Sequence, residues 1–261
     1  MPQAPSPLAL EEATLATWRA REDVSHFGWR FLAEAGFSGR VNAVWPLAWT
    51  GPVGVGPAIE AAEAWYAARS LPCVFKIADS CAFPYGLPEE LAARGYAPDT
   101  ETLVMHCGLA RAGVALDAPW GILAEASGED IVLTAHRPSV FETVLGLDAS
   151  PGDAAERLAV LGRTPRPRAF GVIRRDHRPA AVGMMSLAPN GYAGVYAMRT
   201  LAPFRRQGLA MALLDALAAA AEHAKAHSLF LQVEAANGPA IALYRRAGFE
   251  TAYAYRYWRK S

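Results

Sequence analysis

Two stretches of the sequence, one in each half of the chain, follow the same order of a helix, a strand and a second helix. SLPCVFKI, which begins at Ser70, parallels SLFLQVEA, which begins at Ser228. LAARGY, which ends at Tyr96, parallels YRRAGF, which ends at Phe249. The alternative is a coincidence between helices rich in Ala, Leu and Arg. We infer from the shared order a tandem duplication, in which one α/β unit occurs twice.

The length of the chain is compatible with two units. At roughly 150 residues per domain, the 261 residues make one large domain or two small ones. Hydrophobic residues account for 52% and charged residues for 19%, which excludes a disordered chain, a coiled coil and a collagen-like chain. Lys and Arg together number 25, as do Asp and Glu, so the net charge is zero. We therefore expect neither nucleic acid nor a membrane as a partner.

Cysteine usage and the distribution of apolar residues indicate a compartment. Cys73, Cys81 and Cys107 are too few and too irregularly spaced for a disulfide framework or a structural zinc site. The N-terminal MPQAPSPLALEEATL lacks a basic region and is interrupted by proline, which argues against a secretory signal. A stretch of about 18 apolar residues, long enough to span a membrane, does not occur. We therefore expect a cytoplasmic protein.

The first half of the chain reads as alternating helices and strands. The expected elements are a helix at residues 10–20, strands around a glycine-rich turn within 28–47, a helix at 58–71, a strand at 72–77, a helix at 88–96 and a strand at 101–107. The Gly/Ala-rich passage at 108–118 shows no strong periodicity, so we interpret it as a linker after a first domain at 1–107.

The second half, residues 119–261, is expected to form a domain of its own. Its predicted elements are a strand at 120–126, helices at 138–147 and 153–162, strands at 169–175, 180–188 and 192–200, a long helix at 208–227, a strand at 229–235, a helix at 239–248 and a strand at 250–258. This order mixes an antiparallel meander with a crossover. It predicts an α/β (α+β layered) fold with a mixed central sheet flanked by helices.

The segment between the third strand of this meander and the long helix is typical of a phosphate site. It consists of Arg205, Arg206, Gln207, Gly208, Leu209 and Ala210. A turn there presents unpaired backbone N–H groups at the positive end of a helix dipole, and two arginines add charge. Gly208 and Ala210 allow a ligand to approach the backbone closely. The alternative is an ordinary basic helix start with a glycine in the connection.

A second segment begins at Asn237, which is a good N-cap residue for the helix that follows. Local helix chemistry accounts for most of this segment, including Arg245, Arg246 and the terminating Gly248. Tyr244 is the exception. A phenol in mid-helix is usually a core aromatic, but beside a thiol it could deliver a proton to a leaving thiolate.

Together these segments resemble the GNAT (Gcn5-related N-acetyltransferase) superfamily. RRQGLA is similar to its Q/R-x-x-G-x-G/A loop, and NGPAIALYRRAGF is similar to its N-x-x-A-x-x-L-Y-x-x-x-G-F segment. The resemblance covers residues from about 119 to 261 and implies that acetyl-CoA is the cosubstrate. It implies pyrophosphate contacts from residues 205–210 and proton donation by Tyr244. It also implies pantetheine contacts from Met198, Arg199, Thr200 and Asn237.

The resemblance implies transfer of an acetyl group from acetyl-CoA to a primary amine of a small molecule or peptide. The amine needs a base, and Gln232, at the position where some relatives carry a glutamate, cannot serve. Glu234 is the next carboxylate on the same strand face. The alternatives are that Glu234 is only a solvated carboxylate, and that water relayed by backbone or Tyr196 takes the proton. The protein as a whole could instead be a non-catalytic module that responds to acetyl-CoA.

The first half resembles a degenerate second copy of this fold. When the glycines that end the two repeats are aligned, Leu91 replaces Tyr244 and Pro84 replaces Asn237. The glycine-rich stretch 51–56 contains one proline and is followed by another, which remove N–H groups that a phosphate would need. We expect this half to be structural and to wall one side of the acceptor cleft.

Several residues remain as weaker candidates. Arg40, Asn42, Trp45 and Trp49 could face that cleft, or else belong to the core and the interface between the halves. His223 and His227 have the spacing of a metal pair, but no third ligand is identifiable, so we expect no metal site. The duplicated halves are compatible with a monomer or a homodimer.

Overall fold

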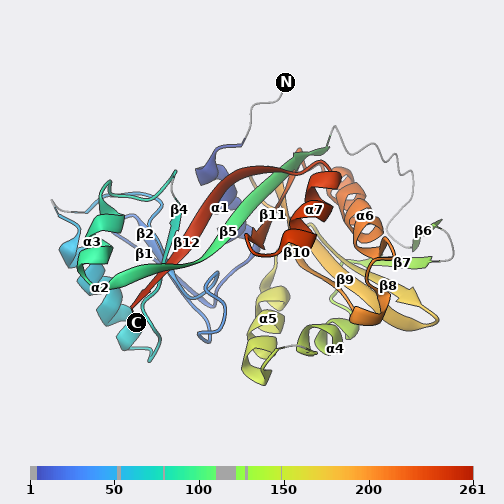
Figure 1. Ribbon diagram of the computed structural model, residues 1–261, viewed down its shortest axis with the longest axis horizontal. Helices are drawn as coiled ribbons and strands as arrows, with labels where there is room; N and C mark the ends of the chain where they lie inside the picture. Colours follow the sequence, from blue (N-terminus) through green and yellow to red (C-terminus); the bar gives the residue numbers. More distant parts are fainter. Residues whose placement is uncertain are drawn as a thin grey trace.

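Figure 1 shows the computed structural model of the chain, which describes residues 5–51, 54–78, 80–109, 122–126, 129–147 and 149–260. The described strands form one sheet in the order β1-β2-β3-β4-β12-β5-β11-β10-β9-β8-β7-β6. The strands are β1 Glu22–His26, β2 Trp29–Ala33, β3 Val44–Trp45, β4 Phe75–Ala78, β5 Tyr96–Gly108, β6 Ile122–Ala126, β7 Glu129–Thr134, β8 Arg168–Arg175, β9 Arg178–Leu187, β10 Tyr192–Thr200, β11 Ser228–Glu234 and β12 Glu250–Lys260.

Helices cover both faces of this sheet (Figure 1). They are α1 Pro7–Thr17, α2 Gly56–Ala67, α3 Leu87–Ala93, α4 Val140–Gly146, α5 Pro151–Arg163, α6 Leu209–His223 and α7 Gly238–Arg246, with a short 3₁₀ turn, η2, at Ala202–Phe204. The predicted class, a mixed sheet flanked by helices in two tandem copies, is confirmed. Strand β7 was not predicted. It begins with two acidic residues, Glu129 and Asp130, and pairs antiparallel with β6 and β8.

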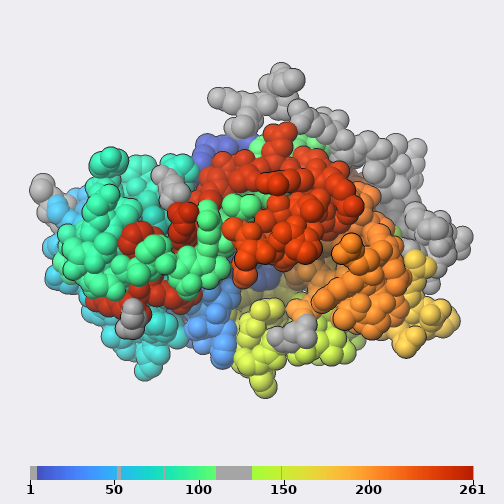
Figure 2. All heavy atoms as spheres, in the orientation of Figure 1, coloured from blue at the N-terminus to red at the C-terminus, as the bar shows by residue number. Residues whose placement is uncertain are grey.

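The two halves exchange strands. Strand β5 of the first half lies between β11 and β12 of the second half, antiparallel to both. Strand β12 in turn lies between β4 and β5 of the first half. Figure 2 shows C-terminal residues, in red, at the surface among the green residues of the first half. Each half of the sheet is therefore completed by a strand from the other half.

The exchange of strands means that neither predicted domain holds all the strands of its own part of the sheet. The boundaries at residues 107 and 119 stay predictions, and most of the linker 108–118 lies outside the described residues. The hydrogen-bonded ladder runs continuously across both halves. We therefore describe the two halves as units of one sheet.

The helices begin and end where the local sequence indicates. The side chains of Ser6, Ser150 and Asn237 accept hydrogen bonds from first-turn N–H groups of α1, α5 and α7. Gly95 and Gly248 adopt the left-handed conformation after α3 and α7, with φ of 83° and 88°, as the predicted helix ends require.

The core lies on both faces of the shared sheet. The predicted apolar face of α6 is confirmed, since Leu209, Leu213 and Leu217 are at most 1% exposed and pack with one cluster of core residues. Helices α1, α4 and α5 pack against the opposite face. Helices α2 and α3 cover the first half of the sheet. Helices α1 and α5 on one face and α7 on the other flank the edge where β10 and β11 end (Figure 1).

One buried ion pair lies within the first half and is contacted by β12 of the second half. Lys76 of β4 donates to both carboxylate oxygens of Glu11 in α1, at 2.6 and 2.5 Å, and both side chains are 1% exposed. Tyr253 of β12 donates to the same carboxylate at 2.5 Å. The ammonium lies 3.5 Å from the ring centroid of Trp45. Because a buried charge is costly without partners, this cluster ties α1, β4 and β12 together.

Candidate active site

The parallel strands β10 and β11 pair at one end only. Their ladder runs from Tyr192 opposite Ser228 to Gly194 opposite Phe230, and then stops. Beyond this point β10 has a bulge, and Ala197 takes a positive φ of 54°. A cleft of about 850 Å³ lies against the separated ends of the two strands. Figure 2 shows this face hollowed between α7 and α5.

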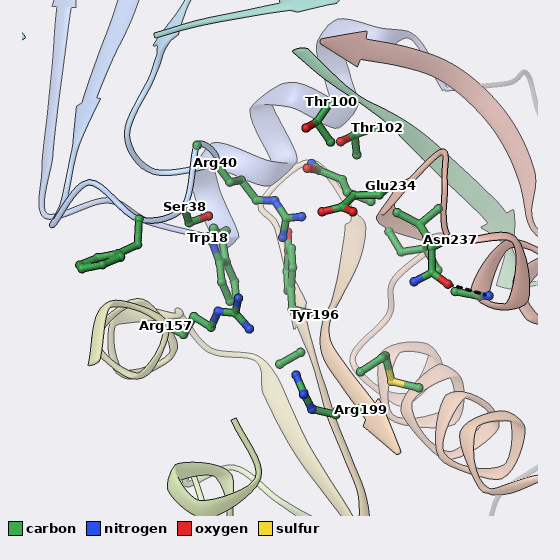
Figure 3. Close-up of a pocket in the computed structure, with 18 of the residues that line it drawn as sticks. Trp18, Ser38, Arg40, Thr100, Thr102, Arg157, Tyr196, Arg199, Glu234 and Asn237 are labelled. Atoms are coloured by element: carbon green, nitrogen blue, oxygen red, sulfur yellow. Dashed lines mark hydrogen bonds between the residues drawn. The ribbon is translucent and has the colours of Figure 1, made fainter. Parts of the chain in front are cut away.

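Residues of α7 form one end of the cleft, together with Met198 of β10. Tyr244 is 8% exposed, and burial raises the pKa of its phenol. No described residue forms a hydrogen bond with this hydroxyl, although the ring packs 5.9 Å from that of Phe249. Asn237 accepts a hydrogen bond from the Ala240 N–H at 3.2 Å (Figure 3). A protonated phenol is therefore available at this end of the cleft.

The other end of the cleft is built by α1 and a loop of the first half. Figure 3 shows Trp18, Ser38 and Arg40 there, beside Tyr196. The rings of Trp18 and Tyr196 stack at 4.8 Å. Because Thr17 already donates its proton to the Ala13 carbonyl, the Tyr196 hydroxyl donates to Thr17 over 2.7 Å. This bond and burial, which raises the pKa of Tyr196, leave its phenol unsuited to relay a proton.

Two polar residues on β11 take different places. Glu234 is exposed and lines the cleft, with no ion-pair partner among the described residues. Gln232 is held between Thr14 and Tyr255, donating to the first at 3.0 Å and accepting from the second at 2.9 Å. Glu234 is thus the carboxylate of β11 that can meet a ligand.

The start of α6 lies outside this lining. Its N-cap residue Gly208 has a φ of 84° and provides no side-chain cap, and space around its Cα is open. Arg205 and Arg206 are exposed, and Arg205 Nε donates to the Thr200 carbonyl at 3.2 Å. Uncapped N–H groups flanked by two arginines suit an anion such as a pyrophosphate.

The sequence model of the Acetyltransferase (GNAT) family matches residues 142–249, from within α4 to the residue before β12. This match contains β10, α6, β11 and α7 and hence most of the cleft. We call the second half of the chain, residues 119–261, which contains this match, the GNAT half. The resemblance drawn from the two sequence motifs is confirmed.

Solved structures share the fold of the whole chain. A GCN5-related N-acetyltransferase from Kribbella flavida is 20% identical, with a TM-score of 0.70 over 98% of this chain and 96% of its own. A tandem GNAT protein from the clavulanic acid biosynthesis pathway is 18% identical, with a TM-score of 0.60 over 83% and 74%. A conserved protein of unknown function from Staphylococcus epidermidis, 12% identical, has a TM-score of 0.64 over 97% and 99%. No curated protein matches in sequence.

The GNAT half supplies most of the predicted site residues that line the cleft. Met198, Arg199, Glu234, Asn237 and Tyr244 meet there. The remaining predicted contacts, Thr200 and the segment 205–210, lie outside the lining, and the side chain of Leu209 belongs to the core.

The first half contributes residues to the cleft of the GNAT half. Among the four first-half residues that the sequence offered for the cleft, Arg40 lines it. Of the two options for Asn42, Trp45 and Trp49, a place in the cleft does not hold. Asn42 and Trp45 are buried, Asn42 against Glu156 of the second half, and Trp49 packs on Trp29 with ring centroids 5.4 Å apart. Their alternative as core residues is correct.

Several other lining residues carry no local sequence signal. They come from the end of α1, a loop, α5 and β12, which only the tertiary fold brings together, and are Trp18, Ser38, Arg157, Tyr255 and Tyr257. The described residues hold no group of three metal-ligating side chains. Among the described helices, none is long and apolar enough to cross a membrane.

Proposed function

We propose that the protein transfers an acetyl group from acetyl-CoA to a primary amine of a small molecule or peptide. The observation that carries this proposal is the convergence of Met198, Asn237 and Tyr244 where β10 and β11 separate. A polar cleft open between two unpaired strand ends can hold an extended amide-containing arm beside a phenol. The GNAT family model matches the part of the chain that contains these residues.

The chain's own groups suit the parts of acetyl-CoA. The segment 205–210, which ends in the uncapped N–H groups at the start of α6, would hold its pyrophosphate, with Arg205 and Arg206 as charge partners. Met198, Arg199, Thr200 and Asn237 would contact the pantetheine arm. The thioester brings an acetyl group already activated for attack, so the protein has mainly to position the reactants and manage protons.

Two side chains are assigned to proton transfer. The Glu234 carboxylate accepts the proton that the amine must lose, either directly or through a water molecule. As the new C–N bond forms and the C–S bond breaks, the Tyr244 phenol donates its proton to the sulfur. Burial supports this role, because it raises the pKa of Tyr244 and keeps the phenol protonated. The engaged hydroxyl of Tyr196 speaks against the relay through that residue.

The first half is assigned a structural role. Leu91, which replaces the proton donor, is fully buried in the core of that half. Strands β3 and β4 pair there at a single position, Val44 opposite Phe75. The half supplies β5 to the GNAT sheet and one wall of the cleft. A cytoplasmic location and a monomeric or homodimeric state stay predictions.

A thiol-release assay with acetyl-CoA and a panel of primary amines tests the proposal. The panel contains amino acids, their carboxamides, simple alkylamines and peptides with free N-termini, and calorimetry measures acetyl-CoA binding in parallel. Amine-dependent release of CoA is the expected result. Saturable binding without release on any amine indicates the non-catalytic module instead. No binding and no thermal stabilisation by acetyl-CoA would overturn both.

A further inference from the structure

The cleft is lined by more positive than negative side chains. Its arginines are Arg40, Arg157, Arg199 and Arg259, and its carboxylates are Asp153 and Glu234. Arg157 pairs with Asp153 at 2.7 Å, and Arg259 pairs with Asp99 at 3.4 Å. No described carboxylate lies within ion-pair distance of Arg40, whose electrostatic neighbours are the phenols of Tyr196, Tyr255 and Tyr257.

Arg40 is partly buried and has no carboxylate partner among the described residues, although it lies within hydrogen-bonding reach of the Tyr255 hydroxyl. Its Nε has almost no accessible surface and no hydrogen-bond partner among the described residues. The guanidinium carbon lies 5.8 Å from the ring centroid of Trp18. A partly desolvated guanidinium without a carboxylate is costly, and a planar oxyanion satisfies it best, because the two can form parallel hydrogen bonds.

The loop that carries Arg40 is held firmly in place. The Glu156 carboxylate of α5 accepts hydrogen bonds from the backbone N–H groups of Ala35, Phe37 and Ser38, at 2.9, 3.1 and 2.6 Å. It also accepts from Asn42 Nδ2 at 2.9 Å. The guanidinium therefore enters the cleft from a fixed backbone, which lowers the cost of binding a ligand.

Arg40 lies at the end of the cleft away from the residues assigned to acetyl-CoA. Figure 3 shows it on the side of Trp18 and Ser38, with Asn237 across the cleft and Glu234 between. The diphosphate of acetyl-CoA is assigned to the start of α6, outside the lining. The Arg40 charge, which no described carboxylate balances, thus faces the space left for the acceptor.

We infer that the acceptor is an amine that also carries an oxyanion group, a carboxylate or a phosphate, bound by Arg40. The inference rests on the proposed function for the presence of an amine. It narrows the acceptor from amines in general to amino acids, peptides with an anionic group near the amine, or phosphorylated amines. Simple alkylamines and polyamines are disfavoured, because their charge repels Arg40.

Matched acceptors test this inference by kinetics. α-Amino acids are compared with their carboxamides, and phosphoethanolamine with ethanolamine, in the wild type, Arg40→Met, Arg40→Lys and Arg19→Met. In at least one pair, the wild type should have a higher kcat/KM for the anionic acceptor than for its neutral counterpart. Arg40→Met should reduce this ratio of kcat/KM values by about 10- to 100-fold, mainly by raising KM for the anionic acceptor. Arg40→Lys should restore part of it. Arg19 is exposed and outside the lining, so Arg19→Met should behave as wild type.

A binding measurement separates this inference from the proposed function. N-acetylamino acids and their amides, and N-acetylated phosphoethanolamine and ethanolamine, are titrated calorimetrically into each variant at saturating CoA. Tighter binding of an anionic member that Arg40→Met removes supports the inference even without turnover. Equal binding of both members, or the same preference in folded Arg40→Met, overturns it even where amines are acetylated. Thermal midpoints establish that each variant is folded.

Discussion

The Glu156 carboxylate in the second half of the chain accepts a hydrogen bond of 2.9 Å from Asn42 Nδ2 in the first half. The same carboxylate accepts hydrogen bonds from three backbone N–H groups of the loop before Asn42. Glu156 is 2% exposed and belongs to α5, whereas this loop carries Ser38 and Arg40 into the cleft. The contact therefore couples the packing of the two halves to the shape of the cleft.

Replacing Glu156 by Gln is expected to loosen this wall. One acceptor oxygen becomes an NH₂ donor that faces backbone donors, so the free energy of unfolding should fall by about 1–3 kcal/mol. KM for the acceptor should rise more than KM for acetyl-CoA, and urea unfolding with steady-state kinetics measures both. Glu142→Gln is the control, since its pair with Arg137 is solvent-exposed and should contribute under about 1 kcal/mol. Equal effects of the two variants would contradict the assignment.

The buried pair of Lys76 and Glu11 makes a prediction about stability. Glu11→Ala leaves the Lys76 ammonium buried without its carboxylate, so unfolding free energy should fall by about 3–5 kcal/mol. The double variant Glu11→Leu/Lys76→Met removes both charges and should recover much of that loss. Denaturant unfolding of the three proteins measures the coupling. A double variant as unstable as the single one would show that packing, not charge, dominates here.

Tyr244→Phe tests the proton donor. Loss of the hydroxyl should lower kcat by about 100-fold and leave the affinity for acetyl-CoA nearly unchanged. The protonated phenol is the active form, and burial raises its pKa above the ordinary value of 10.0, so this group should not reduce activity at any pH below about 10. Tyr85→Phe is the control, because Tyr85 is fully exposed. A kcat for Tyr244→Phe within twofold of wild type would remove the role.

Gly208→Ala tests the anion site at the start of α6. Gly208 has a φ of 84° and open space around it, so a methyl group strains only the backbone, at about 1 kcal/mol. Gly86→Ala is a matched control, since Gly86 is the N-cap of α3 with a φ of 86° and equally open surroundings. Both variants should lose similar stability in thermal unfolding. Calorimetry should show weaker acetyl-CoA binding for Gly208→Ala but not for Gly86→Ala. Equal affinities of the two variants for acetyl-CoA would place the diphosphate elsewhere.

The helices, and the segments assigned to acetyl-CoA at their starts, could be predicted from the sequence because they depend on near neighbours. Asn237 caps α7 through a bond three residues along the chain, and the i, i+4 leucines of α6 mark its buried face. Strand β7 escaped prediction because acidic residues begin it and its six residues have little periodicity of their own. Arg40 was one of four residues that could face the cleft. No local sequence pattern distinguished it from Trp49, which packs in the core of the first half.

The sequence alone determined most of the elements, the repeat and the GNAT motifs, because periodicity, capping and glycine positions act within a few residues. Only the tertiary structure decided that β5 and β12 each complete the other half's sheet, since backbone pairing carries no record of its partner in the sequence. The same holds for the cleft. It forms where β10 and β11 separate, and its charge balance depends on which arginines the fold leaves without a carboxylate.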